Sequence, residues 1–160
     1  MIKGIFAFVV TAYDIVFAAC TADSVNLINK ISAEEIRRRI LIALFSDDEL
    51  MHELVLKGGN ALALVHKVGA RASFDMDFSI QKAFADVEAA KTRIFDALRR
   101  EFASIGYEIF DEKFANKPSE RKPEQPDWWG GYLVQFKLAE RALYEKLRGD
   151  VEALRRQSEV

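Results

Sequence analysis

Cysteine and histidine are scarce in this chain, and their scarcity excludes several kinds of site. Cys20 is the single cysteine, so the chain has no internal disulfide and no thiolate cluster for zinc. This composition fits a reducing compartment, and we expect a cytoplasmic protein. The two histidines, His52 and His66, are too few for a histidine-rich metal site. A metal ion bound here would therefore need carboxylate ligands.

A large net charge is also missing. The 160 residues include 23 basic and 25 acidic side chains, which gives a formal charge of -2. The composition as a whole therefore carries no electrostatic signature of a nucleic-acid-binding protein, and any such contact needs a local patch. Half of the residues, 50%, are apolar, so a chain of this length can bury the core of one ordinary domain.

A mostly apolar stretch, MIKGIFAFVVTAYDIVFAACTA, opens the chain. Its lysine, its apolar run and the small residues near Cys20 loosely resemble a secretion signal or a lipoprotein anchor. Asp14 interrupts the run, and a charge in that position argues against a signal or a membrane span. We expect residues 1–31 to form a packed helix, a strand or an unusual start of unclear role, with no membrane partner. The remaining residues, 32–160, are expected to form one domain.

Hydrophobic periodicity predicts the helices and strands of that domain. Ser32-Ala33-Glu34-Glu35 is a capping box that begins a helix over 33–45, and SDDEL at 46–50 is expected to end it. The later pattern predicts a strand in ELVLKGG, a helix after Asn60, a strand over 71–80, a helix over 85–105, strands over 107–114 and 132–140, and a helical tail with a weak point at Gly149. The prolines fall in a predicted loop over 116–131. This order predicts an α/β or α+β fold with a mixed sheet flanked by helices.

The predicted strand RASFDMDFSI carries the first candidate chemistry. Strict alternation places Arg71, Ser73, Asp75 and Asp77 on one face and the apolar residues on the other. Two neighbouring carboxylates repel each other unless a cation lies between them, and Mg²⁺ commonly bridges protein carboxylates to substrate phosphates. Arg71 and Ser73, on the same face, are candidate phosphate contacts.

The stretch LKGGNALAL carries the second group of candidate site residues. Gly58 and Gly59 allow close approach of the backbone to a phosphate, and the helix after Asn60 offers unpaired N–H groups. Each feature alone also has a plainer interpretation: the glycines form a turn, the aspartates form a solvated face, Lys57 and Lys137 are solvated, and His66 packs in the interior. Their joint order along the chain favours a nucleotide polyphosphate site.

Two motifs in this order, Lys-Gly-Gly-x-Ala-Leu and Arg-x-Ser-x-Asp-x-Asp-Phe, resemble the signature of the AbiEii/AbiGii toxin family. This family is a branch of the DNA polymerase β-like nucleotidyltransferase superfamily. The segment WGGYLVQFKL resembles the family's later strand, whose lysine corresponds to Lys137. The resemblance covers residues 32 to 160. It implies a nucleotidyltransferase fold in which the Gly58-Gly59 loop holds the triphosphate, Asp75 and Asp77 bind two Mg²⁺ ions, and Lys137 contacts the nucleotide.

The resemblance also implies a function. Members act as toxins in toxin-antitoxin or phage-defence systems, and some transfer nucleotides to the 3' end of tRNA. We therefore expect Mg²⁺-dependent transfer of a nucleoside monophosphate from an NTP to an RNA or protein acceptor, with a cognate antitoxin as partner.

The sequence departs from the family pattern at its third carboxylate. The family places this residue after the lysine strand and an intervening helix, whereas the chain stops at Val160. Glu108, Asp111 and Glu140 are acidic, but none has the family's position. One alternative is therefore a truncated, inactive remnant that binds nucleotide or a partner protein. The other is a structural α/β protein whose Asp-x-Asp strand is simply solvated.

Overall fold

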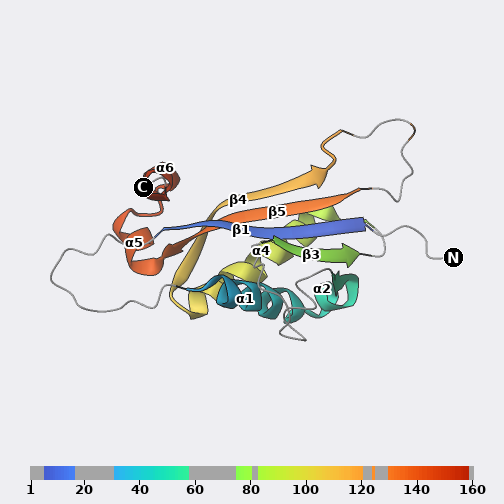
Figure 1. Ribbon diagram of the computed structural model, residues 1–160, viewed down its shortest axis with the longest axis horizontal. Helices are drawn as coiled ribbons and strands as arrows, with labels where there is room; N and C mark the ends of the chain where they lie inside the picture. The colour runs from blue at the N-terminus through green and yellow to red at the C-terminus, as the bar shows by residue number, and fades with distance from the viewer. Residues whose placement is uncertain are drawn as a thin grey trace.

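The computed structural model describes residues 6–16, 31–57, 75–80, 83–120, 124 and 130–158. Within these residues, five strands form one sheet in the order β2-β3-β1-β5-β4 (Figure 1). The strands are β1 (Phe6–Val16), β2 (Leu54–Leu56), β3 (Asp75–Ile80), β4 (Tyr107–Lys117) and β5 (Gly131–Glu140). The central pair β1–β5 is parallel, and the other neighbours are antiparallel. The predicted mixed sheet flanked by helices is confirmed.

The helix that was predicted over 33–45 is α1 (Ala33–Phe45), with the predicted bounds. Its N-cap is Ser32, whose hydroxyl accepts a hydrogen bond from the Glu35 N–H at 3.1 Å. The predicted end of this helix at SDDEL is confirmed, but the residues after it form a second helix that was not predicted, α2 (Asp48–Glu53). Asp47 explains the difference, because its carboxylate accepts the N–H groups of Glu49 and Leu50 at 3.1 Å each and begins a second helix.

The predicted helix over 85–105 is α4 (Val87–Ser104), two residues shorter at its start and one at its end. The Asp86 carboxylate caps it by accepting the Ala89 N–H at 2.9 Å. Gly106 follows the helix with a φ of +83°, a left-handed conformation that glycine adopts without steric cost. This glycine therefore follows the end of the helix, close to the predicted end at residue 105.

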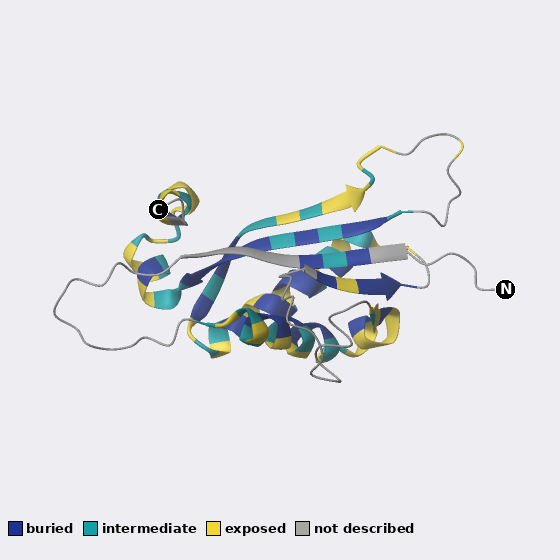
Figure 2. Cartoon of the chain, viewed as in Figure 1, coloured by how far each residue is buried: buried dark blue, intermediate teal, exposed yellow. Residues whose placement is uncertain are grey.

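The core lies between one face of the sheet and the helices α1 and α4 (Figures 1 and 2). Alternate residues of the strands fill it, with fully buried Phe8 from β1 and Phe136 from β5. The Phe136 ring packs against Phe102 of α4, with 5.6 Å between ring centroids. One face of β5 lies wholly in this core, because Tyr132, Val134, Phe136 and Leu138 are all buried.

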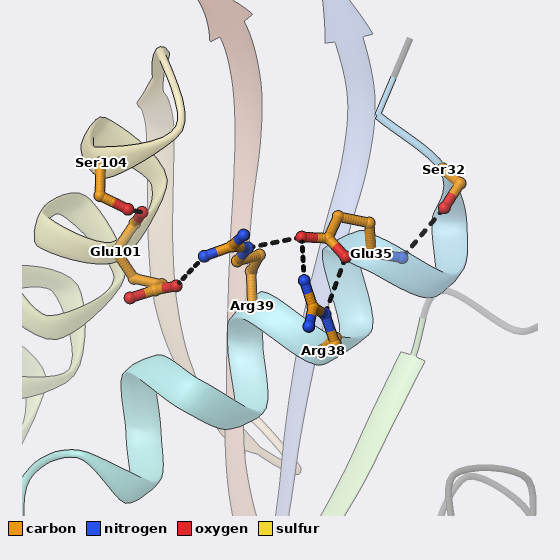
Figure 3. Close-up of polar contacts among 6 residues, drawn as sticks. All are labelled: Ser32, Glu35, Arg38, Arg39, Glu101 and Ser104. Atoms are coloured by element: carbon orange, nitrogen blue, oxygen red, sulfur yellow. Dashed lines mark hydrogen bonds and ion pairs between the residues drawn. The ribbon is translucent and has the colours of Figure 1, made fainter. Parts of the chain in front are cut away.

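Ion pairs join α1 to α4 at the edge of this core (Figure 3). Arg39 of α1 donates to Glu35 at 2.6 Å and to Glu101 of α4 at 2.7 Å. Arg38 also binds Glu35, through two hydrogen bonds of 2.8 Å. The side chain of Arg39 therefore crosslinks the two helices that cover the sheet.

The predicted helical tail forms two helices, α5 (Arg141–Lys146) and α6 (Val151–Ser158), at the end of the sheet where β5 ends (Figure 1). The two helices are separated by a turn that contains Gly149, which has a φ of +70°. A second apolar cluster joins them to the sheet and consists of Phe110, Ala139, Leu143 and Leu154. The predicted loop over 116–131 is shorter than expected, since β4 continues to Lys117 and β5 begins at Gly131.

Part of the N-terminal segment forms the central strand of the sheet. For this segment the sequence left a helix, a strand or an unusual start open, and residues 6–16 form β1. Phe8 and Val10 of this strand have no exposed surface. The proposed domain boundary at residue 32 stays a prediction. Among the described helices, none combines the length and the apolar character needed to cross a bilayer.

Candidate functional site

The strand β3 carries both candidate metal ligands. Asp77 is exposed, whereas its neighbours Met76 and Phe78 are buried in the core, so the predicted alternation is confirmed in this part of the strand. Asp75 is described through its backbone only, which pairs with Thr11 of β1. Asp77 therefore lies on the sheet face opposite α1 and α4, where a ligand can reach its carboxylate.

The sheet register brings β3 and β5 to either side of β1. Thr11 of β1 is paired with Asp75 on one side and with Gln135 on the other. Two residues away along β1, Val9 is paired with Asp77 and with Leu133. Because neighbouring strands lie about 4.8 Å apart, the backbones of Asp75 and Gln135 are separated by roughly 10 Å. The strand β1 fills this interval, so a phosphate contacted from both strands would have to lie over the face of β1.

Lys137 lies two residues beyond Gln135 on β5 and is only 8% exposed. The plainer interpretation of this residue as a solvated strand lysine is therefore wrong. Two inter-strand spacings, across β1, and two residues along the strand separate it from Asp75, which corresponds to roughly 12 Å between the Cα atoms. A lysine side chain spans about half of that distance, so its ammonium group can approach a phosphate bound beside the aspartates.

Lys57 marks the start of the candidate phosphate loop. Its side chain is exposed, and its backbone N–H donates to the Asp77 carbonyl oxygen at 2.8 Å. This bond continues the β2–β3 ladder by one residue and places the backbone of Lys57, the residue before Gly58 in the sequence, beside Asp77. Five other predicted site residues and His66 lie outside the described residues, and their roles remain predictions: Gly58, Gly59, Asn60, Arg71 and Ser73.

The described carboxylates provide part of what a divalent metal site needs. Asp77 is exposed and offers the oxygen donors that Mg²⁺ prefers, so this part of the site fits such an ion. Across the described ranges, however, no three His, Cys, Asp or Glu side chains gather in a group able to hold a metal. Two of the acidic residues considered for the third position have other partners: Glu108 accepts from Arg141 at 2.8 Å, and Asp111 pairs with Arg155.

Sequence reasoning did not identify β1 as a part of this site. The segment FAFVVTAYDIV is rich in aromatic and β-branched residues, which favour strands, and that signal was available. Gln135 was also missed as a site position, because only the pairing of β1 with both neighbours aligns it with Asp75. Such long-range pairing leaves no local mark in a sequence.

Comparison with known proteins supplies the family. The chain matches the family described as Nucleotidyl transferase AbiEii toxin, Type IV TA system, over residues 39–155. No curated protein and no solved structure matched the chain. The family match spans more than half of the sequence and includes β3, β5 and the segment between β2 and β3. The protein therefore belongs to the AbiEii nucleotidyltransferase toxin family of type IV toxin-antitoxin systems.

Proposed function

We propose that the protein is a Mg²⁺-dependent toxin of a toxin-antitoxin or phage-defence system that transfers a nucleoside monophosphate from an NTP to an acceptor. The acceptor is an RNA, with the 3' end of tRNA as the first candidate, or a protein. One combined observation carries the proposal: the chain belongs to a nucleotidyltransferase family, and the strands with its aspartates and its lysine flank the same central strand.

Asp75 and Asp77 are proposed to hold Mg²⁺ against the phosphates of the NTP. The exposure of Asp77 supports this role, because its carboxylate is open to an incoming metal ion and its bound phosphates. The bound metal would neutralise the charge that develops on the phosphate oxygens. The chain itself would orient the triphosphate through the Gly58-Gly59 backbone, with Lys57, Asn60, Arg71 and Ser73 around it.

Lys137 is proposed to contact the nucleotide across β1. Its burial supports this role, since an ammonium group shielded from water interacts more strongly with a phosphate than an exposed one does. In the reaction, the acceptor hydroxyl gives up its proton to solvent as its oxygen bonds to the α-phosphorus, and the bond from that phosphorus to the bridging oxygen of the β-phosphate breaks. The nucleoside monophosphate then remains on the acceptor, and pyrophosphate leaves.

The proposed biological partner is a cognate antitoxin. The family description names a type IV toxin-antitoxin system, which supports the presence of such a partner. A second candidate function is an inactive remnant that binds nucleotide or a partner protein without transfer. The observation that favours it is that Glu108 and Asp111, two of the acidic residues considered for the third metal position, are paired with Arg141 and Arg155.

Labelling separates these functions. Purified protein is incubated with Mg²⁺, total tRNA and each α-labelled NTP in turn, and the RNA and protein fractions are examined for label. Transfer to RNA or protein is expected, and it should be lost in the double variant Asp75→Ala Asp77→Ala. Asp96→Ala is the matched control, since Asp96 is an exposed aspartate on α4 away from the site, and this variant should retain transfer.

Binding of NTP without any label in RNA or protein would reject the transferase and support the remnant. Absence of both transfer and Mg²⁺-dependent NTP binding would reject both functions. If Asp75→Ala Asp77→Ala transferred as well as the wild type, the assignment of the metal ligands would be wrong.

A further inference from the structure

The burial of Lys137 has a local cause. On its sheet face, Lys137 lies between Gln135, which is half-buried, and Ala139, which is fully buried in the second apolar cluster. Its neighbour on β4 is Phe110, a member of the same cluster. Farther from the cluster, Lys113 of β4 is exposed. Burial along this face therefore follows the position of α5 and α6, which cover the end of the sheet nearest Lys137.

A β-bulge in β4 lies beside the same residue. Phe110 is paired with Lys137 and Lys113 with Gln135, so two residues of β4 face the one intervening residue of β5. The bulge contains Asp111, which has a φ of +52°, a left-handed conformation uncommon for residues other than glycine. Bulges of this kind often occur next to active sites, where they set the direction of neighbouring side chains.

Arg155 of α6 holds this bulge. Its guanidinium binds both carboxylate oxygens of Asp111, through Nε at 3.1 Å and through a shorter bond from Nη2. The Asp111 side chain is only 6% exposed, and a carboxylate so deeply buried needs a charged partner. Arg155 also donates to Glu152 one turn earlier at 2.7 Å, which fixes its direction along α6.

The same helix is anchored a second time by the residue before Arg155. Leu154 has no exposed surface and packs in the second apolar cluster, and α6 also lies against β1. The ion pair and the apolar contact act together, since losing the pair would leave a buried charge at the surface on which α6 rests.

We infer that Asp111 and Arg155 form a clasp that docks α6 on β4 and thereby keeps Lys137 buried in position for the nucleotide. Both are positioning residues, because they act through Lys137 and not on the substrate. The nucleotide part of this inference rests on the proposed function, whereas the burial of Lys137 by the clasp does not.

Lysine accessibility tests the clasp directly. The full chain is treated with a limiting amount of an amine-acetylating reagent, and mass spectrometry follows the modification rate of each lysine. In the wild type, Lys137 should react about tenfold more slowly than exposed Lys57. Arg155→Met should raise the rate at Lys137 by about fivefold and leave the rate at Lys57 unchanged.

Two further variants separate the clasp from general damage. Asp111→Asn removes the charge but keeps a residue that tolerates the left-handed conformation, and it should expose Lys137 as Arg155→Met does. Arg156→Met changes the next residue of α6, an exposed arginine, and should leave Lys137 protected. Unchanged labelling of Lys137 in both clasp variants would overturn the inference, and so would equal reaction rates at Lys57 and Lys137 in the wild type, because Lys137 would then not be protected.

Kinetics test the link to the nucleotide. Arg155→Met should raise the KM for the NTP by about tenfold with little change in kcat, whereas loss of folded enzyme would lower kcat and leave KM unchanged. In a Lys137→Ala background, Arg155→Met should add nothing to KM, because the clasp acts through that lysine. An additive increase would contradict the positioning role.

The two failures are distinguishable. If Arg155→Met exposes Lys137 but Lys137→Ala leaves NTP affinity unchanged, the clasp stands and the proposed nucleotide contact is wrong. If Lys137→Ala weakens NTP binding but Arg155→Met changes neither labelling nor KM, the clasp is wrong and the proposed function stands.

Discussion

The ion pairs between α1 and α4 make a stability prediction that depends on pH (Figure 3). Glu35 accepts hydrogen bonds from Arg38 and Arg39, and Arg39 continues to Glu101 on the other helix. Hydrogen bonds from Arg38, opposed by partial burial and supported by those from Arg39, lower the pKa of Glu35 from 4.5 to about 2. We expect Glu35→Gln to lower the free energy of unfolding at neutral pH.

The magnitude follows from this pKa. Taken directly, a change from 4.5 to about 2 corresponds to at most about 3 kcal/mol. The Glu35 side chain keeps 29% of its surface exposed, so solvent screens the pairs, and we expect a loss of about 1 kcal/mol. Because the folded pKa lies below the unfolded one, this stabilisation is complete above about pH 5 and disappears as the pH falls towards 2.

Urea unfolding followed by circular dichroism at pH 7, pH 4 and pH 3 measures the effect. The free energies of unfolding of wild type and Glu35→Gln should differ most at pH 7 and converge as Glu35 becomes protonated. Glu88→Gln is the control, since Glu88 pairs with Lys91 on the surface of α4 with 80% of its side chain exposed, and it should change stability little at any of these pH values. A difference for Glu35→Gln that is as large at pH 3 as at pH 7 would refute the ionic origin.

Three further changes should alter the free energy of unfolding, measured in the same way. Val10→Ala should cost about 2 kcal/mol because Val10 is fully buried in β1, whereas Val9→Ala on the other face should cost less than half of that. Asp47→Ala should cost about 1 kcal/mol, since it leaves two N–H groups of α2 without their acceptor. Gly106→Ala should cost about 1 kcal/mol through its left-handed backbone alone, because an added Cβ meets no atom within 4 Å.

Local signals explain which elements the sequence predicted well. The capping box at Ser32 and the apolar spacing after it lie within one short segment, so α1 was predicted with its observed bounds. The extra helix α2 depended on Asp47, whose cap was read as part of a turn. The strand β1 is a nearly continuous apolar run, so its hydrophobic residues show no clear helical or strand periodicity. Such a run is compatible with either a buried strand or a buried helix.

The candidate site also combines features that local sequence patterns predict with features that depend on long-range contacts. The Asp-x-Asp spacing and the glycine pair are local, so the sequence was enough to propose them, and the exposure of Asp77 agrees with that proposal. The burial of Lys137 was not predictable from its own segment of the sequence. The helix α6 lies later in the chain, at Val151–Ser158, and contacts β4 through the ion pair between Arg155 and Asp111. Contacts of this range depend on how the helix docks, which periodicity does not encode.

The position of β1 changes how the family match bears on the site. The match covers residues 39–155, and β1 lies before it, yet β1 is the strand that separates the aspartate strand β3 from the lysine strand β5. If β1 were removed from between them, neither the spacing nor the register that aligns Asp75 with Gln135 would hold. The relative placement of β3 and β5, which lie inside the match, thus depends on β1, which lies outside it. Any role that Lys137 has towards a phosphate at Asp75 and Asp77 therefore requires the N-terminal strand as well as the family motifs.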